Sequence, residues 1–140
     1  MTDSNAKGDA AERELLNGLA DCGWTAMRAP ASGSATDRDL PDVLAGRDGR
    51  FLAIEVKASS SDTVYVDEAE VEALRRFAED FGADARLAFR FNEKHGDPTY
   101  GTDRFGTYLF PPERCYRTDG GNYRMKKPFA LQNGTLYSAI

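Results

Sequence analysis

The dipeptide Asp48-Gly49 constrains the chain most, because it fixes the register of a hairpin that carries acidic side chains. Both residues tolerate the positive φ angles that a tight hairpin turn needs. With these two residues as the loop, Val43 lies opposite Ile54 on the facing strand. One step further along, Asp42 lies opposite Glu55. The sequence therefore predicts a hairpin with two opposed carboxylates.

The polar face of this hairpin also carries a lysine. Because side chains alternate along a strand, Glu55 and Lys57 share one face with Asp42, while the other face is apolar and is formed by Val43, Ile54 and Val56. Carboxylates directly opposed across a ladder repel each other and require a shared proton or a cation. Magnesium binds through one or two carboxylates together with waters and substrate phosphates.

We therefore expect a phosphodiester to complete a metal site on this face, with Lys57 beside the scissile phosphate or the attacking water. The alternative is a surface ion pair, because an acid-x-Lys triplet on a strand often forms nothing more.

The net charge excludes one simple class of nucleic-acid binder. The 140 residues carry a formal charge of −5 with a pI of about 4.9, which argues against a polycationic binder. A DNA enzyme remains possible if basic residues gather on one face, as the cluster Arg124, Lys126 and Lys127 suggests. The chain holds 13 Arg against 5 Lys and 14 Asp against 9 Glu, a balance that suggests a protein that works in concentrated salt.

The remaining candidate metal ligands are few. Cys22 and Cys115 are too few and too far apart to suggest a zinc site, so we expect reduced thiols. The single histidine, His95, lies in a polar run and is predicted to be solvated. No apolar run is long enough to span a membrane, so no membrane partner is expected and the predicted location is cytoplasmic.

The N-terminal region supplies a candidate third acid. Residues 1–6 are predicted to form a disordered arm, and a helix is expected from about Asp9 to Gly23, with capping-box spacing between Asp9 and Glu12. Glu12 projects from the inward side of this helix, where a carboxylate requires a partner. The alternative is that Glu12 only caps the helix.

The rest of the chain is expected to form a single domain over residues 7–140 with a polar insertion at about 92–104. A second helix is predicted over 67–81, with a capping box and Gly82 as its end. Further strands are predicted at 24–29, 64–66, 85–91 and 107–110, and a turn or short helix at 111–114. Alternating strands and helices predict an α/β fold with a central mixed sheet flanked by helices.

Two further features have both a purely structural and a functional interpretation. The small-residue segment over 30–36 is either a flexible loop or a phosphate contact made by Ser32 or Ser34 with support from Arg28. The aromatic residues Phe77 and Phe81 of the second predicted helix are either core residues or a dimer surface.

These residues together resemble the archaeal Holliday junction resolvases of the Hjc type, members of the PD-(D/E)XK nuclease superfamily. The resemblance covers most of the chain, and the run Ala-Pro-Ala-Ser-Gly-Ser followed by Pro-Asp is its most specific part. The matching segments are Lys7-Gly8, Glu12-Arg13, Arg28 to Ser34, Pro41-Asp42, Glu55-Val56-Lys57, the Phe77/Phe81 helix and Thr118 to Tyr123.

The resemblance implies a restriction-endonuclease-like fold and a magnesium-dependent crossover junction endodeoxyribonuclease, with Mn²⁺ as a substitute for Mg²⁺. By this resemblance Glu12, Asp42 and Glu55 would bind the metal, and Ser32 and Lys57 would be catalytic. Arg13, Arg28 and Ser34 would contact DNA, and the second predicted helix would lie at a dimer interface.

The implied substrate is four-way junction DNA, nicked symmetrically by a homodimer during recombination and repair. A sliding clamp or a recombination helicase is an expected protein partner. The protein itself is expected to associate with the nucleoid. Two alternatives stay open: another nuclease of the superfamily acting on duplex ends or flaps, and a junction-binding architectural dimer that does not cut.

Overall fold

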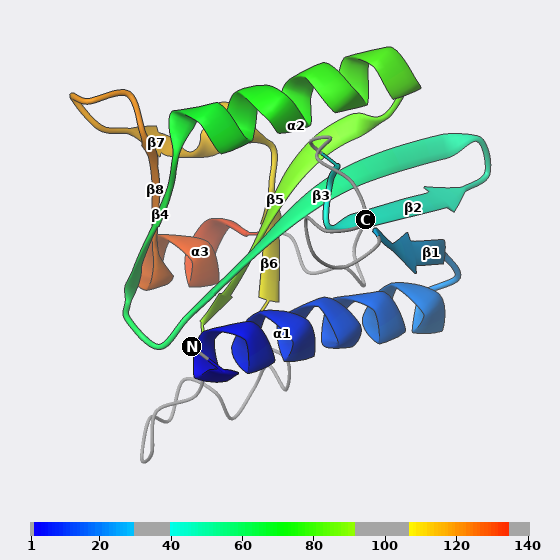
Figure 1. Cartoon of the computed structure of the whole chain (residues 1–140), viewed down its shortest axis with the longest axis horizontal. Helices are drawn as coiled ribbons and strands as arrows, with labels where there is room; N and C mark the ends of the chain where they lie inside the picture. Colours follow the sequence, from blue (N-terminus) through cyan, green and yellow to red (C-terminus); the bar gives the residue numbers. More distant parts are fainter. Residues whose placement is uncertain (1, 30–39, 92–106, 135–140) are drawn as a thin grey trace.

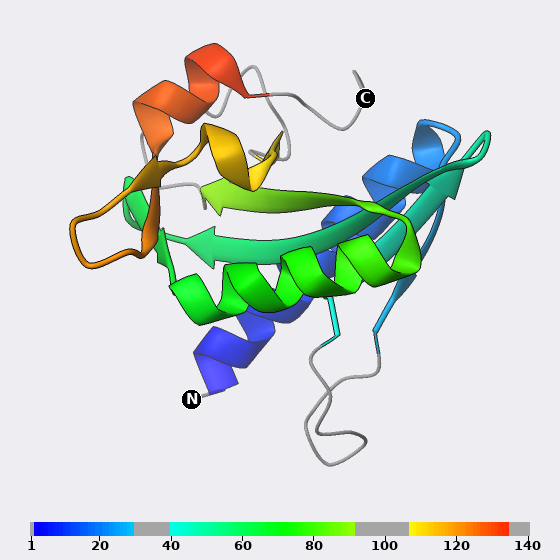
Figure 2. The same cartoon turned by 90° about the horizontal axis from the view of Figure 1, so that it is seen from above.

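The computed structural model describes residues 2–29, 40–91 and 107–134, with side chains from residue 8 onward. A five-stranded sheet lies between two long helices (Figures 1 and 2). Its strands, in spatial order, are β1 (Thr25–Arg28), β2 (Val43–Arg47), β3 (Arg50–Ser59), β5 (Asp84–Phe91) and β6 (Thr107–Phe110). The central pair β3 and β5 is parallel and the other pairs are antiparallel, so the predicted mixed α/β sheet is confirmed.

The hairpin of β2 and β3 has the predicted register. Val43 pairs with Ile54, and Arg47 pairs with Arg50 at the turn. Asp48 and Gly49 both have positive φ angles, 53° and 80°, as a two-residue hairpin turn requires. The turn chemistry of the sequence therefore sets the position of every side chain on both strands.

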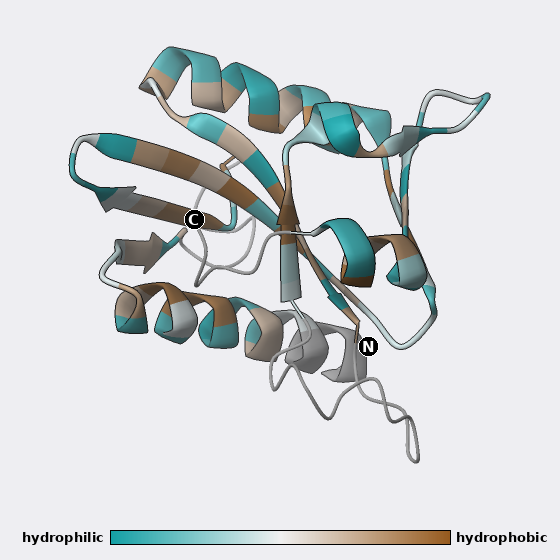
Figure 3. Cartoon of the chain, turned by 180° about the vertical axis from the view of Figure 1, so that it is seen from behind, coloured by the Kyte–Doolittle hydropathy of each residue, from teal (hydrophilic) through white to brown (hydrophobic). Residues whose placement is uncertain are grey.

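The two long helices cover opposite faces of the central sheet. Helix α1 (Thr2–Asp21) packs on β1 and β3, and helix α2 (Glu68–Phe81) packs on the other face against β3 and β5. Figure 3 shows apolar residues along the central strands and polar residues on the outer side of α2. The face towards α1 buries Val43, Ile54 and Val56, as predicted, together with Leu15, Leu19 and Trp24.

Helix α2 begins and ends where the sequence predicts. The Glu70 carboxylate accepts a hydrogen bond from the Asp67 amide at 3.4 Å, which is one half of the predicted capping box. Gly82 ends the helix in the left-handed conformation with a φ of 84°. The first residues of α2 are thereby held against the end of β3.

A second, three-stranded sheet was not predicted. Its order is β4 (Thr63–Val66), β8 (Tyr123–Lys126) and β7 (Tyr116–Arg117), and it lies beside the N-terminal end of α2 (Figure 1). The short helix η2 (Pro112–Arg114), at the predicted place, precedes β7, and helix α3 (Lys127–Asn133) follows β8. One face of this sheet completes the core under α2 with Val64, Val66, Tyr123 and Met125.

Three expectations differ from the structure. Helix α1 begins at Thr2, so the predicted start near Asp9 is wrong, while the arm expected over 1–6 stays a prediction. Asp9 does not cap the helix but lies within it, and its side chain pairs with Arg13 one turn later, a helix-stabilising contact. The predicted basic cluster is divided, because Lys127 is buried while Lys126 is exposed.

Cys115 is buried, and Cys22 is half-buried; both are free thiols. None of the described helices combines the length and apolarity that crossing a membrane would require.

Candidate active site

Asp42 is held at the edge of the sheet immediately before β2. Its carboxylate accepts a hydrogen bond from the Val56 amide at 2.8 Å, and its backbone carbonyl accepts one from the Ala29 amide at 3.0 Å. The first bond ties Asp42 across the hairpin to the strand that carries Glu55. Burial raises the pKa of Asp42, and the Val56 hydrogen bond opposes that rise.

Glu55 lies in the middle of β3 and lines a pocket of about 200 Å³ with Glu70, Pro41 and Leu40. Burial raises its pKa to about 8, and the charge of Asp42 adds to the rise. A carboxyl group in this environment holds a proton near neutral pH unless a cation replaces it. Burial and the neighbouring Asp42 carboxylate therefore both favour the protonated form of Glu55.

Lys57 projects from the same face of β3 towards the first turn of α2. Its ammonium pairs with the Glu70 carboxylate. Burial, the largest single influence, disfavours the charged amine, but the Glu70 hydrogen bond and the charges of the surrounding carboxylates together outweigh it and raise the pKa of Lys57. Glu70 thus lies beside Lys57 in this site, although the sequence predicted for it only the role of a helix cap.

Glu12 projects from α1 towards the edge of the sheet, as its position beside the leucines predicted. Its carboxylate pairs with Arg28 of β1 at 3.0 Å, so its role is not that of a helix cap. The same guanidinium pairs with Asp9, one turn earlier on α1. Burial and the charge of Asp42 raise the pKa of Glu12 despite this pairing.

The three predicted acids influence one another but do not converge on one point. The charges of Asp42 and Glu12 both raise the pKa of Glu55, which places the three carboxylates within electrostatic range. Among the residues with described side chains, no group of three histidine, cysteine or acidic residues is arranged to hold a metal ion. The Glu12 carboxylate instead accepts a hydrogen bond from the Arg28 guanidinium.

The other predicted site residues fall into two groups. Arg13 is mostly exposed, with its side chain 62% accessible, and pairs with Asp9 on its own helix. Ser32, Ser34, His95 and the polar insertion lie outside the described residues.

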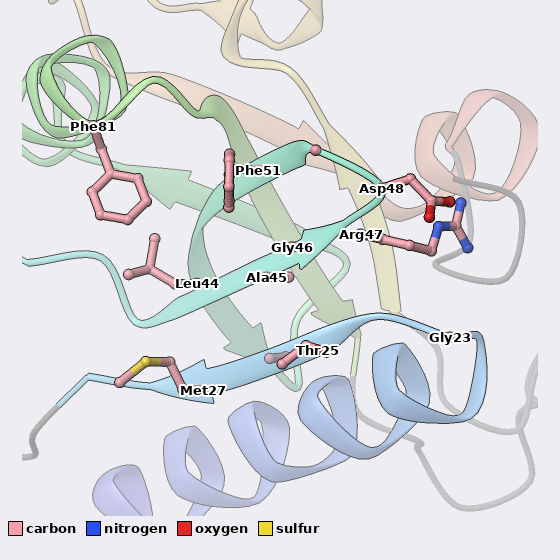
Figure 4. Close-up of a pocket in the computed structure, with 12 residues that line it drawn as sticks. Gly23, Thr25, Met27, Leu44, Ala45, Gly46, Arg47, Asp48, Phe51 and Phe81 are labelled. Atoms are coloured by element: carbon pink, nitrogen blue, oxygen red, sulfur yellow. The ribbon is translucent and has the colours of Figure 1, made fainter.

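Aromatic side chains of α2 form an exposed apolar surface at the opposite end of that helix. Phe81 is 51% exposed and stacks on Phe77 with a ring-centroid distance of 5.3 Å. Phe51 of β3 contacts the Phe81 ring edge-on, at 6.1 Å. Figure 4 shows Phe51 and Phe81 beside Leu44 and Met27 in a pocket of about 620 Å³. Phe77 itself is partly buried and packs on the core, which is one of its two predicted roles, whereas Phe81 is exposed.

The chain is similar to known junction-cutting enzymes along most of its length. The model of the family described as archaeal Holliday junction resolvase (Hjc) matches residues 3–138. The crossover junction endodeoxyribonuclease Hjc of Sulfurisphaera tokodaii is 29% identical over 124 residues, which cover 88% of this chain and 78% of the relative. The enzyme of the same name from Methanocaldococcus jannaschii is 32% identical over 84% of this chain and 74% of its own.

A solved structure agrees with the fold. The structure of Archaeoglobus fulgidus Hjc, described as a Holliday junction resolvase from an archaeal hyperthermophile, matches with a TM-score of 0.75. The match has 29% sequence identity and covers 94% of this chain and 97% of that chain. The extent of the family match, the shared fold and the buried acids beside Lys57 lead to one conclusion: the chain belongs to the archaeal Holliday junction resolvase (Hjc) family.

Proposed function

We propose that this resolvase cuts four-way DNA junctions by metal-dependent hydrolysis of phosphodiesters, and that two copies place paired nicks in opposed strands. The observation that carries the chemistry is the position of Glu55 on β3 between Lys57 and Asp42, which the Val56 amide ties to the same strand; burial and the charge of Asp42 raise the pKa of Glu55 to about 8. Acidic groups packed this close are stabilised by a shared proton or by a cation, and a nuclease uses a cation there to act on a phosphate.

Asp42 and Glu55 would hold Mg²⁺, or Mn²⁺ in its place, with Glu12 as a third ligand. The donor set fits, because all three are carboxylates and hard divalent ions take oxygen ligands. Bound there, the metal would stabilise negative charge on the scissile phosphate and favour ionisation of a water. Arg28 pairs with the Oε1 atom of Glu12, so it competes with a metal ion for that oxygen in the free protein.

Lys57 would donate hydrogen bonds to a non-bridging oxygen of the scissile phosphate or to the attacking water. The ammonium stays charged at neutral pH, because the hydrogen bond that it donates to Glu70 and the charges of the nearby carboxylates raise its pKa despite burial. A charged donor fixed in place before the reaction stabilises the transition state without reorganisation. Ser32 would act beside the same phosphate.

Arg13 and Arg28 would contact the DNA backbone, with Ser34 beside them. Arg13 is exposed at the end of α1 that carries Glu12, so a phosphate can reach it with little desolvation. Arg28 becomes available when a cation takes its place at Glu12. Metal binding and DNA binding would then favour each other through one guanidinium.

The exposed apolar surface at the C-terminal end of α2 would be the homodimer interface. Phe81, Phe51 and Met27 are each between 45% and 59% exposed and lie around one pocket. Clustered aromatic rings of this kind are typical of the buried centre of an interface. A two-fold dimer formed there matches the near two-fold symmetry of a four-way junction.

The decisive experiment compares a labelled immobile four-way junction with a linear duplex of the same arm sequence, in Mg²⁺ or EDTA. Wild type should place paired nicks in the junction only, and EDTA or Glu55→Ala should abolish them while junction affinity is kept or improved. Glu72→Ala, an exposed acid on α2, is the matched control and should cut normally. Equal cutting of the duplex would support a general nuclease, and tight binding without cutting would support an architectural role.

A further inference from the structure

The outer face of the small sheet carries an arrangement that the catalytic proposal does not use. Tyr65 of β4 and Tyr116 of β7 are directly paired with the same residue, Arg124 of the middle strand β8. Residues paired in this way point to the same side of a sheet. Lys126, two positions along β8, points to that side as well. We call these four residues the tyrosine platform.

The platform is exposed. Tyr65 is 60% and Tyr116 is 55% accessible, although large aromatic residues are usually much more buried. The alternate residues of the same strands, such as Val66, Tyr123 and Met125, are buried in the core under α2. The tyrosines are therefore not required to build the core.

The charges on the platform favour an anionic partner. The guanidinium of Arg124 lies 4.0 Å from the centre of the Tyr116 ring, and Arg124 forms no ion pair with another described residue. Its Nε atom is covered and has no hydrogen-bond partner within the described part of the chain. Residues 114–127 hold five basic residues and one acid, in a chain whose net charge is −5. Arg117 pairs with Glu68 and Lys127 is buried, so the positive charge that this segment presents to solvent is that of Arg114, Arg124 and Lys126.

A pocket adjoins the platform. It has a volume of about 330 Å³ and is lined by Tyr116, Arg124 and Lys126 on one side and by Phe129 of α3 on another. Aromatic walls with basic side chains at the rim suit a flat ring attached to a phosphate. The pocket and the two tyrosines offer stacking surfaces on both sides of Arg124.

We propose that the tyrosine platform binds unpaired nucleotides of single-stranded DNA, with bases stacked on Tyr65 and Tyr116 and the backbone phosphate at Arg124 and Lys126. Several anionic partners could satisfy the positive charge of the platform, but only one with unpaired aromatic rings can also stack on the tyrosines. Bases inside a duplex are already stacked on each other, and an acidic peptide has no ring to place on the tyrosines.

The test measures binding of a fluorescent oligothymidine of about twelve nucleotides, within the range of single-strand site sizes. The same buffer, with EDTA, is used for a blunt duplex and for polyglutamate. The double variant Tyr65→Ala/Tyr116→Ala should bind the single strand at least about tenfold more weakly, because each stacked base contributes several-fold to affinity. Its affinity for the duplex should stay at the wild-type value. Unchanged single-strand binding, or an equal loss for all three probes, overturns the proposal.

The matching variants separate stacking from charge. Tyr65→Phe/Tyr116→Phe keeps the rings and should bind like wild type, whereas a loss comparable to that of the alanine pair would overturn stacking. Arg124→Ala should reduce the salt dependence of binding by about 0.7 in slope, the value of one phosphate contact on a single strand. Arg76→Ala removes an exposed arginine of α2 and should leave the slope unchanged; an equal decrease would mean diffuse attraction and overturn the site.

Thermal melting checks the fold of each variant. Because the substituted side chains are outside the core, each variant should melt at the wild-type temperature. The assay requires neither metal nor cleavage. A failure of the junction-cutting proposal would therefore leave these measurements unaffected.

Discussion

The carboxylate of Glu70 on α2 is paired with the ammonium of Lys57 on β3, so the second helix holds the lysine of the candidate active site. Glu70 also belongs to the helix cap, through its bond to the Asp67 amide. One acidic side chain thus joins the start of α2 to the chemistry of the central strand.

Replacing Glu70 by glutamine should lower the cleavage rate about tenfold or more with little change in junction affinity. Glutamine fits the third position of a capping box, so the helix should keep its start. The lost charge frees the Lys57 ammonium, and a displaced catalytic group costs rate and not substrate binding. Single-turnover cleavage and equilibrium binding of the same junction measure the two effects separately.

Glu72→Gln is the control for this change, because Glu72 is exposed on the same helix, two residues further on. It should cut at the wild-type rate. A Glu70→Gln enzyme with weakened binding but normal single-turnover cleavage would show that Glu70 does not position Lys57.

Magnesium should stabilise the protein against heat through Asp42 and Glu55. At ten times its dissociation constant a ligand adds about 1.4 kcal/mol to the free energy of unfolding. For a chain of this size that corresponds to a rise in Tm of roughly 3 to 6 °C. Asp42→Asn should abolish the rise, since the amide can still accept the Val56 hydrogen bond but is a poor magnesium ligand. Asp80→Asn, an exposed site on α2, should retain it; an equal rise in all three proteins would place the metal elsewhere.

Phe81→Lys should convert the homodimer to a monomer. A charge at the centre of an apolar interface is strongly unfavourable, whereas a lysine at a helix C-terminus is favourable for the fold. Light scattering should therefore give half the wild-type mass with an unchanged circular dichroism spectrum. Leu131→Lys changes an exposed leucine of α3 in the same way and should remain dimeric. Retention of the dimer in Phe81→Lys would exclude this surface.

Cys115 should make the fold weaker at alkaline pH. Burial and the neighbouring Glu113 raise its pKa from the ordinary 9.0 to about 12. Below pH 9 both the folded and the unfolded chain keep the thiol proton, so the full stability is present. Between pH 9 and 12 only the unfolded chain releases it, and the free energy of unfolding falls. Urea unfolding across this range should show a shallower decline for Cys115→Ala than for wild type; parallel curves would contradict the shift.

Potassium chloride should stabilise the chain. With a net charge of −5 and more Asp and Glu than Lys and Arg, repulsion between acidic groups opposes the compact state until salt screens it. The urea midpoint should rise between low salt and molar KCl. A midpoint that stays constant or falls would count against an adaptation to concentrated salt.

The parts of the site that local chemistry determines were predictable from the sequence. The Asp48-Gly49 turn is a two-residue signal, and it fixes Val43 opposite Ile54 without any long-range information. The inward direction of Glu12 follows in the same way from helical periodicity. In both cases the deciding residues are neighbours in the sequence.

The pairs that bring different elements together could not be predicted. Lys57 and Glu70 are 13 positions apart, and Arg28 and Asp9 are 19 apart, so no periodic pattern relates them. The small sheet was missed for the same reason. Thr63 pairs with Lys126, and β7 is two residues long, too short for an alternation to be recognised.

The parallel pairing of β3 with β5 has a consequence for the order in which the enzyme becomes active. Glu12, Asp42 and Glu55 leave the ribosome early, but β3 obtains its second neighbour only after α2 and the whole of β5 have been made. A parallel pair cannot form before its crossover is complete. During synthesis the growing chain therefore contains every proposed metal ligand before the sheet that aligns them has formed. The topology thus prevents nuclease activity until β5 has been synthesised.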